Sequence, residues 1–256
     1  MNSPILAVII GCEIGFWVAV FGGLSLRYLL SRLEIRRLFP DITIQIPPTL
    51  VVCSNEFGRF LDDNGLWDDA LAGAVPFSKL QERFLKGKLR DEMIRDLRAY
   101  LQTVCEPLAV RSSSILEDSL HLPLAGLYST YMLPNNGPSV EERLASLLAA
   151  VKLVWASTYG EDPRAYFRQT NYRLEDERMA VVIQTLGGGR RGDYFYPSFS
   201  GVAQSYNFYP VSYMKSDDGV AQIALGLGKT VVEGGPIVRF CPRYPQLLPQ
   251  FANIRD

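Results

Sequence analysis

Histidine is nearly absent from this chain of 256 residues, which contains only His121. The four cysteines are scattered and include no C-x-x-C pair; they are Cys12, Cys53, Cys105 and Cys241. Without a second histidine or a cysteine pair, the sequence gives little support to a Cys/His metal site. We therefore expect no metal ligands in this chain, and reduced thiols of the kind found in cytoplasmic proteins.

An excess of charge of either sign is also missing. Lysine and arginine number 26 against 27 acidic residues, so the formal net charge is −1 and the isoelectric point is near 6.0. A protein that binds nucleic acid electrostatically carries a strongly basic patch or stripe. The composition therefore excludes nucleic acid from the expected partners. Its 48% of hydrophobic residues is typical of a globular protein.

Two common catalytic motifs are lacking. No G-x-S-x-G elbow accompanies the serines at 112–114, and the single histidine lies in a segment rich in leucine and proline, which argues against a serine hydrolase. The segment LGLGKT at 225–230 ends like a Walker A loop, but Ile223 stands where that loop needs its first glycine. A pair of glycines there can still let the backbone approach a ligand closely.

One long apolar run is present near the N-terminus, over residues 4–26. It extends for about twenty residues, the length of a membrane helix, and only Glu13 interrupts it. Four arginines follow at once: Arg27, Arg32, Arg36 and Arg37. By the positive-inside rule, these arginines would keep the rest of the chain in the cytoplasm, anchored to the inner face of the membrane. A buried helix of a soluble domain is the alternative, and the sequence leaves both open.

Local patterns predict several helices. The stretch 54–64 begins with Ser54 as N-cap and ends at an Asn-Gly stop. Apolar residues recur at helical spacing between 79 and 101. Ser139 and Glu142 have the spacing of a capping box at the start of another helix.

Strands are expected between these helices, because runs of β-branched and aromatic residues end at glycine or proline. These runs cover residues 42–52, 179–186, 194–210 and 219–228. The segment LAVRSSS at 108–114 is expected to be a short buried strand that runs into a polar turn. The mixture predicts an α+β fold.

Arg111, at the end of that strand, is the strongest candidate for a functional side chain. Its planar, permanently charged guanidinium suits a phosphate group, and the serine hydroxyls beside it add neutral donors. An ion pair with Glu117 or Asp118 is the structural alternative, and spacing alone does not decide between them. His121 is expected to be a plain loop residue. The glycine-rich segment 185–193 is expected to be a hairpin loop rather than a lid over phosphates.

Taken together, these segments resemble the N-terminal nucleotide-binding domain of the phosphoenolpyruvate synthase and pyruvate phosphate dikinase family. LAVRSSSILEDSLHLPLAG resembles the family's V-R-S-S-x-x-x-E-D…A-G signature. IQIPPTLVVCSNEFGRFLDDNGL, ERMAVVIQ, FSGVAQSYNFYP and ALGLGKTVVEGG follow the family's pattern and order. The resemblance covers residues 40–256, and it implies an ATP-grasp-like fold in which two α+β subdomains clamp ATP.

The resemblance also implies roles for individual residues. Arg111 would contact the ATP phosphates with Ser112 beside it, and Gln184 would line the adenine pocket. Four further residues would shape the nucleotide cleft, namely Ser200, Gly201, Gly226 and Gly228. Glu117 and Asp118 would organise the Arg111 loop rather than hold metal. The implied cofactors are ATP and Mg²⁺, and the implied acceptor is a histidine on another domain or chain.

The chain departs from the family pattern at three places. Leu24 stands where the family has a phosphate-contacting lysine, and Lys229 stands at an acidic position. The family's metal-binding carboxylates and its phosphohistidine domain would lie beyond the last residue. We therefore expect an apolar N-terminal helix with a basic flank over 1–37 and an ATP-grasp-like domain over 38–256, truncated at its C-terminus. The alternative function is a catalytically incomplete nucleotide-binding or interaction module, anchored to a membrane if residues 4–26 form a membrane helix.

Overall fold

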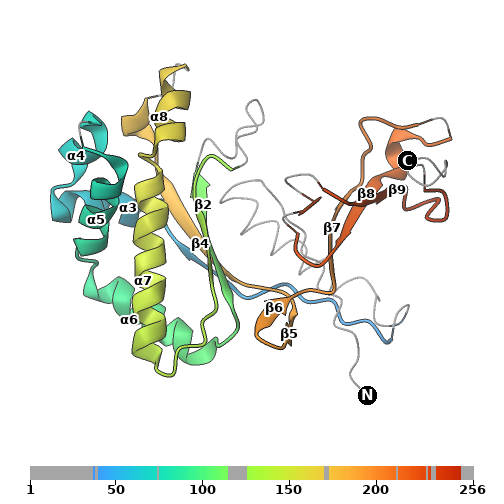
Figure 1. Cartoon of the computed structure of the whole chain (residues 1–256), viewed down its shortest axis with the longest axis horizontal. Helices are drawn as coiled ribbons and strands as arrows, with labels where there is room; N and C mark the ends of the chain where they lie inside the picture. The colour runs from blue at the N-terminus through green and yellow to red at the C-terminus, as the bar shows by residue number, and fades with distance from the viewer. Residues whose placement is uncertain are drawn as a thin grey trace. The chain divides into compact units, whose positions relative to one another are not determined.

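A computed structural model describes residues 37, 40–73, 75–114, 126–169, 173–211, 213–228, 230–231 and 235–248. These residues form mixed α+β structure, as the sequence predicts (Figure 1). They divide into two compact units. The first comprises the described residues of Pro47–Leu186, and the second combines those of Gly187–Asp256 with 37 and 40–46. The predicted boundary at residue 37 lies at the edge of the described part.

The first unit is built on an antiparallel sheet with the strand order β1-β4-β2-β3. Its strands are β1 (Thr49–Val52), β2 (Leu108–Ser114), β3 (Thr130–Leu133) and β4 (Met179–Thr185). Its helices are α3 (Ser54–Asn64), α4 (Trp67–Ala72), α5 (Phe77–Lys86), α6 (Asp91–Thr103), α7 (Val140–Ser157) and α8 (Glu161–Arg168), with a 3₁₀ turn at Leu174–Asp176. In Figure 1, α7 lies along the sheet with α5 and α6 beside it.

The core of this unit lies between the helices and one face of the sheet. Alternate strand residues point into it, so Leu108 and Val110 of β2 and Val181 and Ile183 of β4 belong to the core while their neighbours do not. Aromatic rings from α3, α5 and α7 fill its centre, namely Phe57, Phe60, Phe84, Trp155 and the adjacent Tyr159. The helices thus cover one face of the sheet.

Helix ends follow the local signals closely, with one correction. Ser139 caps α7 as predicted, because its Oγ accepts a hydrogen bond from the Glu142 N–H at 3.2 Å. The stop at Gly65 is confirmed, since this residue has the left-handed conformation that favours glycine (φ 59°). The assignment of Ser54 as N-cap is wrong: Ser54 is the first helical residue, and Cys53 is the cap without a side-chain hydrogen bond.

The periodic stretch 79–101 is broken into α5 and α6 at Gly87. A Cβ on Gly87 would lie 2.6 Å from Cζ of Phe60 on α3, so the chain passes too close to this ring for any other residue. The sequence pattern continues across the break because Leu89, in the connection, still packs against the core. The helix thus ends at a glycine, and the neighbouring ring of Phe60 leaves no room for a side chain there.

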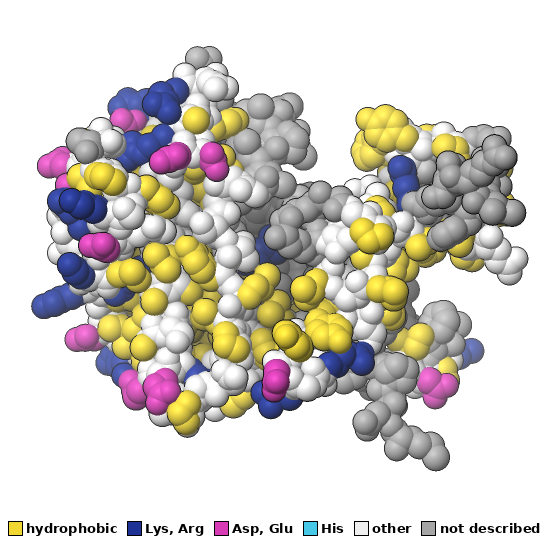
Figure 2. Space-filling view, viewed as in Figure 1, with side chains coloured by type: hydrophobic (Ala, Val, Ile, Leu, Met, Phe, Trp, Pro, Cys, Tyr) yellow, Lys and Arg dark blue, Asp and Glu magenta, His cyan; other side chains and the backbone are white. Residues whose placement is uncertain are grey.

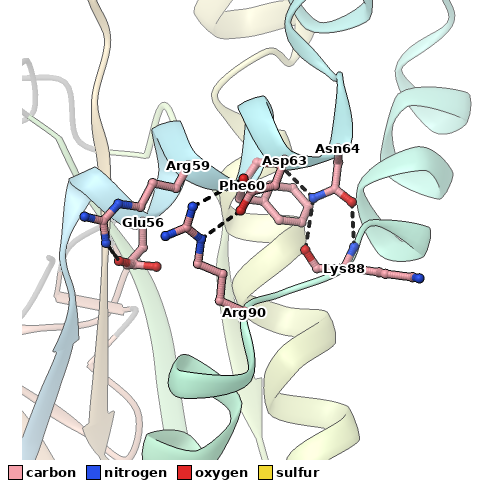
Figure 3. Close-up of polar contacts among 7 residues, drawn as sticks. All are labelled: Glu56, Arg59, Phe60, Asp63, Asn64, Lys88 and Arg90. Atoms are coloured by element: carbon pink, nitrogen blue, oxygen red, sulfur yellow. Dashed lines mark hydrogen bonds and ion pairs between the residues drawn. The ribbon is translucent and has the colours of Figure 1, made fainter.

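Asn64 ties the end of α3 to this connection (Figure 3). Its Nδ2 donates to the carbonyls of Phe60 (2.8 Å) and Lys88 (3.0 Å), and its Oδ1 accepts from the Lys88 N–H (2.7 Å). The side-chain amide thus bonds both the N–H and the C=O of Lys88, as a residue on a neighbouring strand would. Beside it, Arg90 forms a two-bond ion pair with Asp63. The Asn-Gly-Leu segment at the end of α3 is therefore a structural joint.

The described residues of the second unit form five short strands. β5 (Gly189–Arg191) and β6 (Tyr194–Tyr196) form a hairpin, with Gly192 at φ 63° in its turn. β7 (Phe199–Gln204), β8 (Val220–Leu225) and β9 (Val238–Phe240) form a three-stranded antiparallel sheet. A 3₁₀ turn at Ser216–Asp218 precedes β8. The glycine-rich segment 185–193 thus runs from the end of β4 into the expected hairpin.

The face of the first unit seen in Figure 2 shows no single dominant charge. Figure 2 shows Lys and Arg interspersed with Asp and Glu along the helical side of the first unit, as the balanced composition indicates. In the second unit, the loop after β7 exposes Phe208 (72%) and Tyr209 (79%). Within the described ranges, no helix is both long and apolar enough to cross a membrane. Residues 4–26, where an anchor is predicted, lie outside those ranges.

Candidate functional site

The serines after Arg111 belong to a strand rather than to a turn. β2 runs through Ser114 and stays paired with β4 over its whole length, from Leu108↔Thr185 to Ser114↔Met179. The buried strand predicted over 108–114 is therefore confirmed, but Arg111 lies in its middle and not at its end. Pairing with β4 holds these small polar residues in extended form, and all three are buried.

Because side chains alternate along a strand, the two faces of β2 carry different residues. Ser112 and Ser114 lie on the same face as Leu108 and Val110, toward the helices. Arg111 and Ser113 lie on the opposite face. The structure therefore brings Arg111 together with Ser113, and places Ser112 on the other side of the sheet from it.

The register of the sheet defines the rest of this second face. Residues that are directly paired across two strands lie on the same face of the sheet. Gln184 is paired with Ala109 and Thr130 with Arg111, so both lie on the face that carries Arg111. The polar and charged members of what we call the second face are Thr49, Arg111, Ser113, Thr130 and Gln184. Two of the predicted site residues, Arg111 and Gln184, are thus on one surface of the first unit.

Arg111 is partly buried, and it has no hydrogen-bond or ion-pair partner among the described residues. Most other arginines of the first unit are paired, as Arg90 is with Asp63 and Arg98 with Glu141. Glu117, Asp118 and His121 lie outside the described residues, so the ion-pair alternative and the expected loop role of His121 stay predictions.

The hydroxyl of Ser113 is a second unused donor on this face. Its side chain is 8% exposed, and its Oγ has no hydrogen-bond partner within the described chain. A buried hydroxyl without a partner calls for an explanation, and a ligand is one. A guanidinium and a hydroxyl two residues apart on the same face form a donor pair suited to an oxyanion.

Gln184 is held by a contact across the sheet. Its Nε2 donates to Oγ1 of Thr49 at 3.0 Å, and the Thr49 hydroxyl donates in turn to the carbonyl of Pro47 at 3.1 Å. Gln184 is the last residue but one of β4, where it is partly buried and paired with Thr49 of β1. It is therefore an oriented amide rather than a free one.

The predicted site residues of the second unit gather at the turn after β8. Ser200 is buried, and its Oγ donates to the carbonyl of Gly226 at 2.6 Å. Gly226 has the left-handed conformation (φ 78°) that favours glycine. A Cβ on Gly228 would lie 3.5 Å from Cβ of Ser200, so the chain passes directly over this serine. Ser200, Gly226 and Gly228 thus form one glycine-lined turn.

Gly201 has a structural reason of its own. A Cβ there would lie 2.6 Å from the carbonyl oxygen of Gln222 on β8, too close for any side chain. Its smallness is therefore required by strand packing alone.

One arginine of the β5–β6 hairpin, Arg191, has partners within the described chain, unlike Arg111. Arg191 donates to Oγ of Ser198 at 2.6 Å and lies over the ring of Tyr196 at 5.4 Å. In the described part of the chain, His, Cys, Asp and Glu side chains form no group of three or more that could hold a metal ion. Lys229 and Leu24 lie outside that part.

Comparison with known proteins decides the family. The family described as the pyruvate phosphate dikinase AMP/ATP-binding domain matches residues 25–239, most of this chain. The chain belongs to this family. The resemblance found in the sequence is confirmed, and ATP binding is the property of the family as a whole.

Two relatives of the AMP/ATP-binding domain are 29% identical to this chain. One is the uncharacterized phosphotransferase YvkC of Bacillus subtilis (strain 168), matched over 196 residues, and the other is the phosphoenolpyruvate synthase of Aeropyrum pernix, matched over 211 residues. Each match covers 75% of this chain but only 20% and 24% of the respective relative. The chain thus spans about a quarter or less of the length of these curated relatives.

Three polar members of the second face were not predicted from the sequence, namely Thr49, Ser113 and Thr130. Ser113 has a signal that was available, because it lies two residues from Arg111 and strand alternation places it on the same face. Thr49 has no local signal, since its partner Gln184 is 135 residues away.

Proposed function

We propose that this chain is the ATP-binding part of a phosphotransferase of the phosphoenolpyruvate synthase and pyruvate phosphate dikinase type, with an ATP-grasp-like fold. In this proposal, a phosphoryl group of ATP passes to a histidine on another domain or chain. The observation that carries the proposal is a pair of donors, Arg111 and Ser113, that lie on one face of the first unit and have no partner among the described residues. Membership in an ATP-binding family supports it.

Arg111 and Ser113 would bind phosphate oxygens. The guanidinium carries its charge at every physiological pH and offers two parallel N–H donors to an oxyanion. Transfer of a phosphoryl group depends mainly on positioning and on stabilising charge over the equatorial oxygens, which these donors would supply. The acceptor histidine would come from outside this chain, and we assign His121 no part in the transfer.

The remaining predicted residues would bind the rest of the nucleotide. Gln184 would contact the base, and the turn of Ser200, Gly226 and Gly228 would offer backbone groups free of side chains. Gly201 would serve by allowing β7 and β8 to pack. Mg²⁺ would neutralise phosphate charge when bound, but the described residues offer no cluster of carboxylates for it, so we derive no step through the metal.

A catalytically incomplete nucleotide-binding or interaction module is the second candidate. The departures at Leu24 and Lys229 from the family's phosphate-binding pattern favour it. A nucleotide-binding module would also place ATP on Arg111, whereas an interaction module would not bind ATP. The phosphotransferase differs from both because added Mg²⁺ should strengthen ATP binding and support transfer to a histidine.

The test is calorimetric titration of ATP, with and without Mg²⁺, into the full chain and its variants. Loss of a charged hydrogen bond to phosphate costs about 1.5–3 kcal/mol, so Arg111→Ala should weaken ATP binding about 10- to 150-fold. Arg95→Ala is the matched control, because Arg95 is an exposed arginine on α6. Ser113→Ala should weaken binding without lowering the melting temperature, since its hydroxyl has no partner in the described structure.

The outcomes separate the alternatives. Arg111→Ala with normal ATP affinity and a lower melting temperature would contradict the phosphate role and favour a structural ion pair. ATP binding that is unaffected by Mg²⁺ favours the incomplete module.

A further inference from the structure

The hydrogen-bond chain from Pro47 through Thr49 to Gln184 determines how the Gln184 amide is oriented. A threonine hydroxyl has one proton and two lone pairs. The Pro47 carbonyl can only accept, so the single Thr49 hydroxyl proton is directed to it at 3.1 Å. Toward Gln184, Thr49 Oγ1 can therefore only accept, and the atom 3.0 Å away must be the amide nitrogen.

The other polar atom of the Gln184 amide, Oε1, is then available to a ligand. Oε1 of Gln184 diverges from Thr49 because the amide oxygen and nitrogen point in different directions from their shared carbon. It has no hydrogen-bond partner in the part of the chain that the structure describes. Gln184 thus presents an oriented acceptor on the same face as Arg111.

We infer that Thr49 is a positioning residue that sets base selectivity by preventing the Gln184 amide from turning over. This inference rests on the proposed function, in which Gln184 contacts the base. A fixed Oε1 accepts from the exocyclic amino group of adenine. Hypoxanthine carries a carbonyl at that position, which would bring two acceptors face to face.

An amide without Thr49 would lose this selectivity. It can rotate by half a turn about its last bond and donate its Nε2 to a carbonyl instead, so it reads either base. The exchange of one matched for one mismatched hydrogen bond is worth about tenfold in affinity, because a site built for one hydrogen-bond pattern leaves a polar group unpaired with the other.

The experiment compares ATP with inosine triphosphate, which differs from ATP only at this edge of the base. Both are titrated into the full chain and into Thr49→Val, which keeps the β-branched shape on an edge strand but removes the hydroxyl. Thr49→Ser restores the hydroxyl and is the rescue variant. We expect the wild-type chain to prefer ATP about tenfold and Thr49→Val to prefer it less than about threefold, mainly through tighter binding of inosine triphosphate. Thr49→Ser should return the wild-type ratio.

A double-mutant cycle makes the test specific to the amide. In a Gln184→Leu background, which has no amide to orient, Thr49→Val should leave the ratio unchanged. A merely structural role of Thr49 would lower the affinities for both nucleotides together and leave their ratio intact, which would overturn the inference. A wild-type chain that binds ATP and shows the same ratio after Thr49→Val also overturns it, while the proposed function stands. A wild-type chain that binds neither nucleotide overturns both.

Discussion

Replacement of Asn64 by alanine should destabilise the first unit more than removal of the ion pair beside it. The substitution removes three hydrogen bonds at once, of 2.7, 2.8 and 3.0 Å. These bonds connect the end of α3 to the backbone of Lys88, across the break between α5 and α6 (Figure 3). Among the standard residues, only asparagine offers both an amide donor and an amide acceptor at this distance from the backbone.

The expected loss follows from the number of bonds and their exposure. A typical intramolecular hydrogen bond contributes about 0.5–1.5 kcal/mol net, so three bonds are worth about 1.5–4.5 kcal/mol. The backbone groups of Lys88 can turn to water when Asn64 is gone, because their bonds lie in an exposed part of the joint. The loss should therefore fall in the lower half of this range, about 1.5–3 kcal/mol.

Urea unfolding followed by tryptophan fluorescence measures this loss, since Trp67 and Trp155 lie in the same unit as Asn64. Asp63→Ala is the matched control, because it removes an ion pair of the same joint whose partners are largely exposed. Exposed ion pairs are screened by water and salt and contribute little. If Asp63→Ala cost as much as Asn64→Ala, or if Asn64→Ala left the unfolding midpoint unchanged, the account of this joint would be refuted.

Three further predictions concern other parts of the chain. Gly201→Ala should lower the melting temperature of the second unit with no ligand present, by the equivalent of about 1–3 kcal/mol, because a Cβ would press on the paired strand; an unchanged melting curve would contradict this. Asp218 accepts from the Lys215 N–H and pairs with Arg243, which together hold its pKa below the ordinary value. A lowered carboxyl pKa contributes stability above the ordinary value near 4 that is lost as the pH falls through the folded value, so acid should weaken the wild type more than Asp218→Asn in circular dichroism melts between pH 6 and 3. Leu147→Ala on α7, fully buried, should cost about 2–5 kcal/mol in the same urea assay, and a cost below 1 kcal/mol would contradict its place in the core.

Local signals in the sequence predicted local structure well. The cap at Ser139 and the stop at Gly65 depend on neighbouring residues only, and both are confirmed. The break at Gly87 was not predicted, although the glycine is itself a local stop signal, because apolar residues continue at helical spacing beyond it. Periodicity reports which face is buried and says nothing of how closely a distant side chain approaches.

In the candidate site, too, the features that depend on neighbouring residues were predicted better than those that depend on distant strands. The sequence predicted the strand over 108–114 but placed Arg111 at its end, whereas pairing with β4 continues through the three serines that follow Arg111. Once the strand is known, alternation selects Ser113 over Ser112 as the neighbour of Arg111. The contact between Thr49 and Gln184 depends on which strands are adjacent, and that order follows from the whole sheet rather than from either segment.

The strand order has a consequence for the synthesis of this protein. β1 pairs only with β4 among the described strands, and their hydrogen-bonded residues Thr49 and Gln184 are 135 positions apart. At about 5–20 residues per second, a ribosome needs about 7–27 s to make the chain between them. Until β4 is made, the β1 segment, and later the β2 segment, lack the strand that lies between them in the sheet, so their edges are open to pairing with other chains. The face that carries Arg111 and Gln184 can therefore form only after β4 has been made.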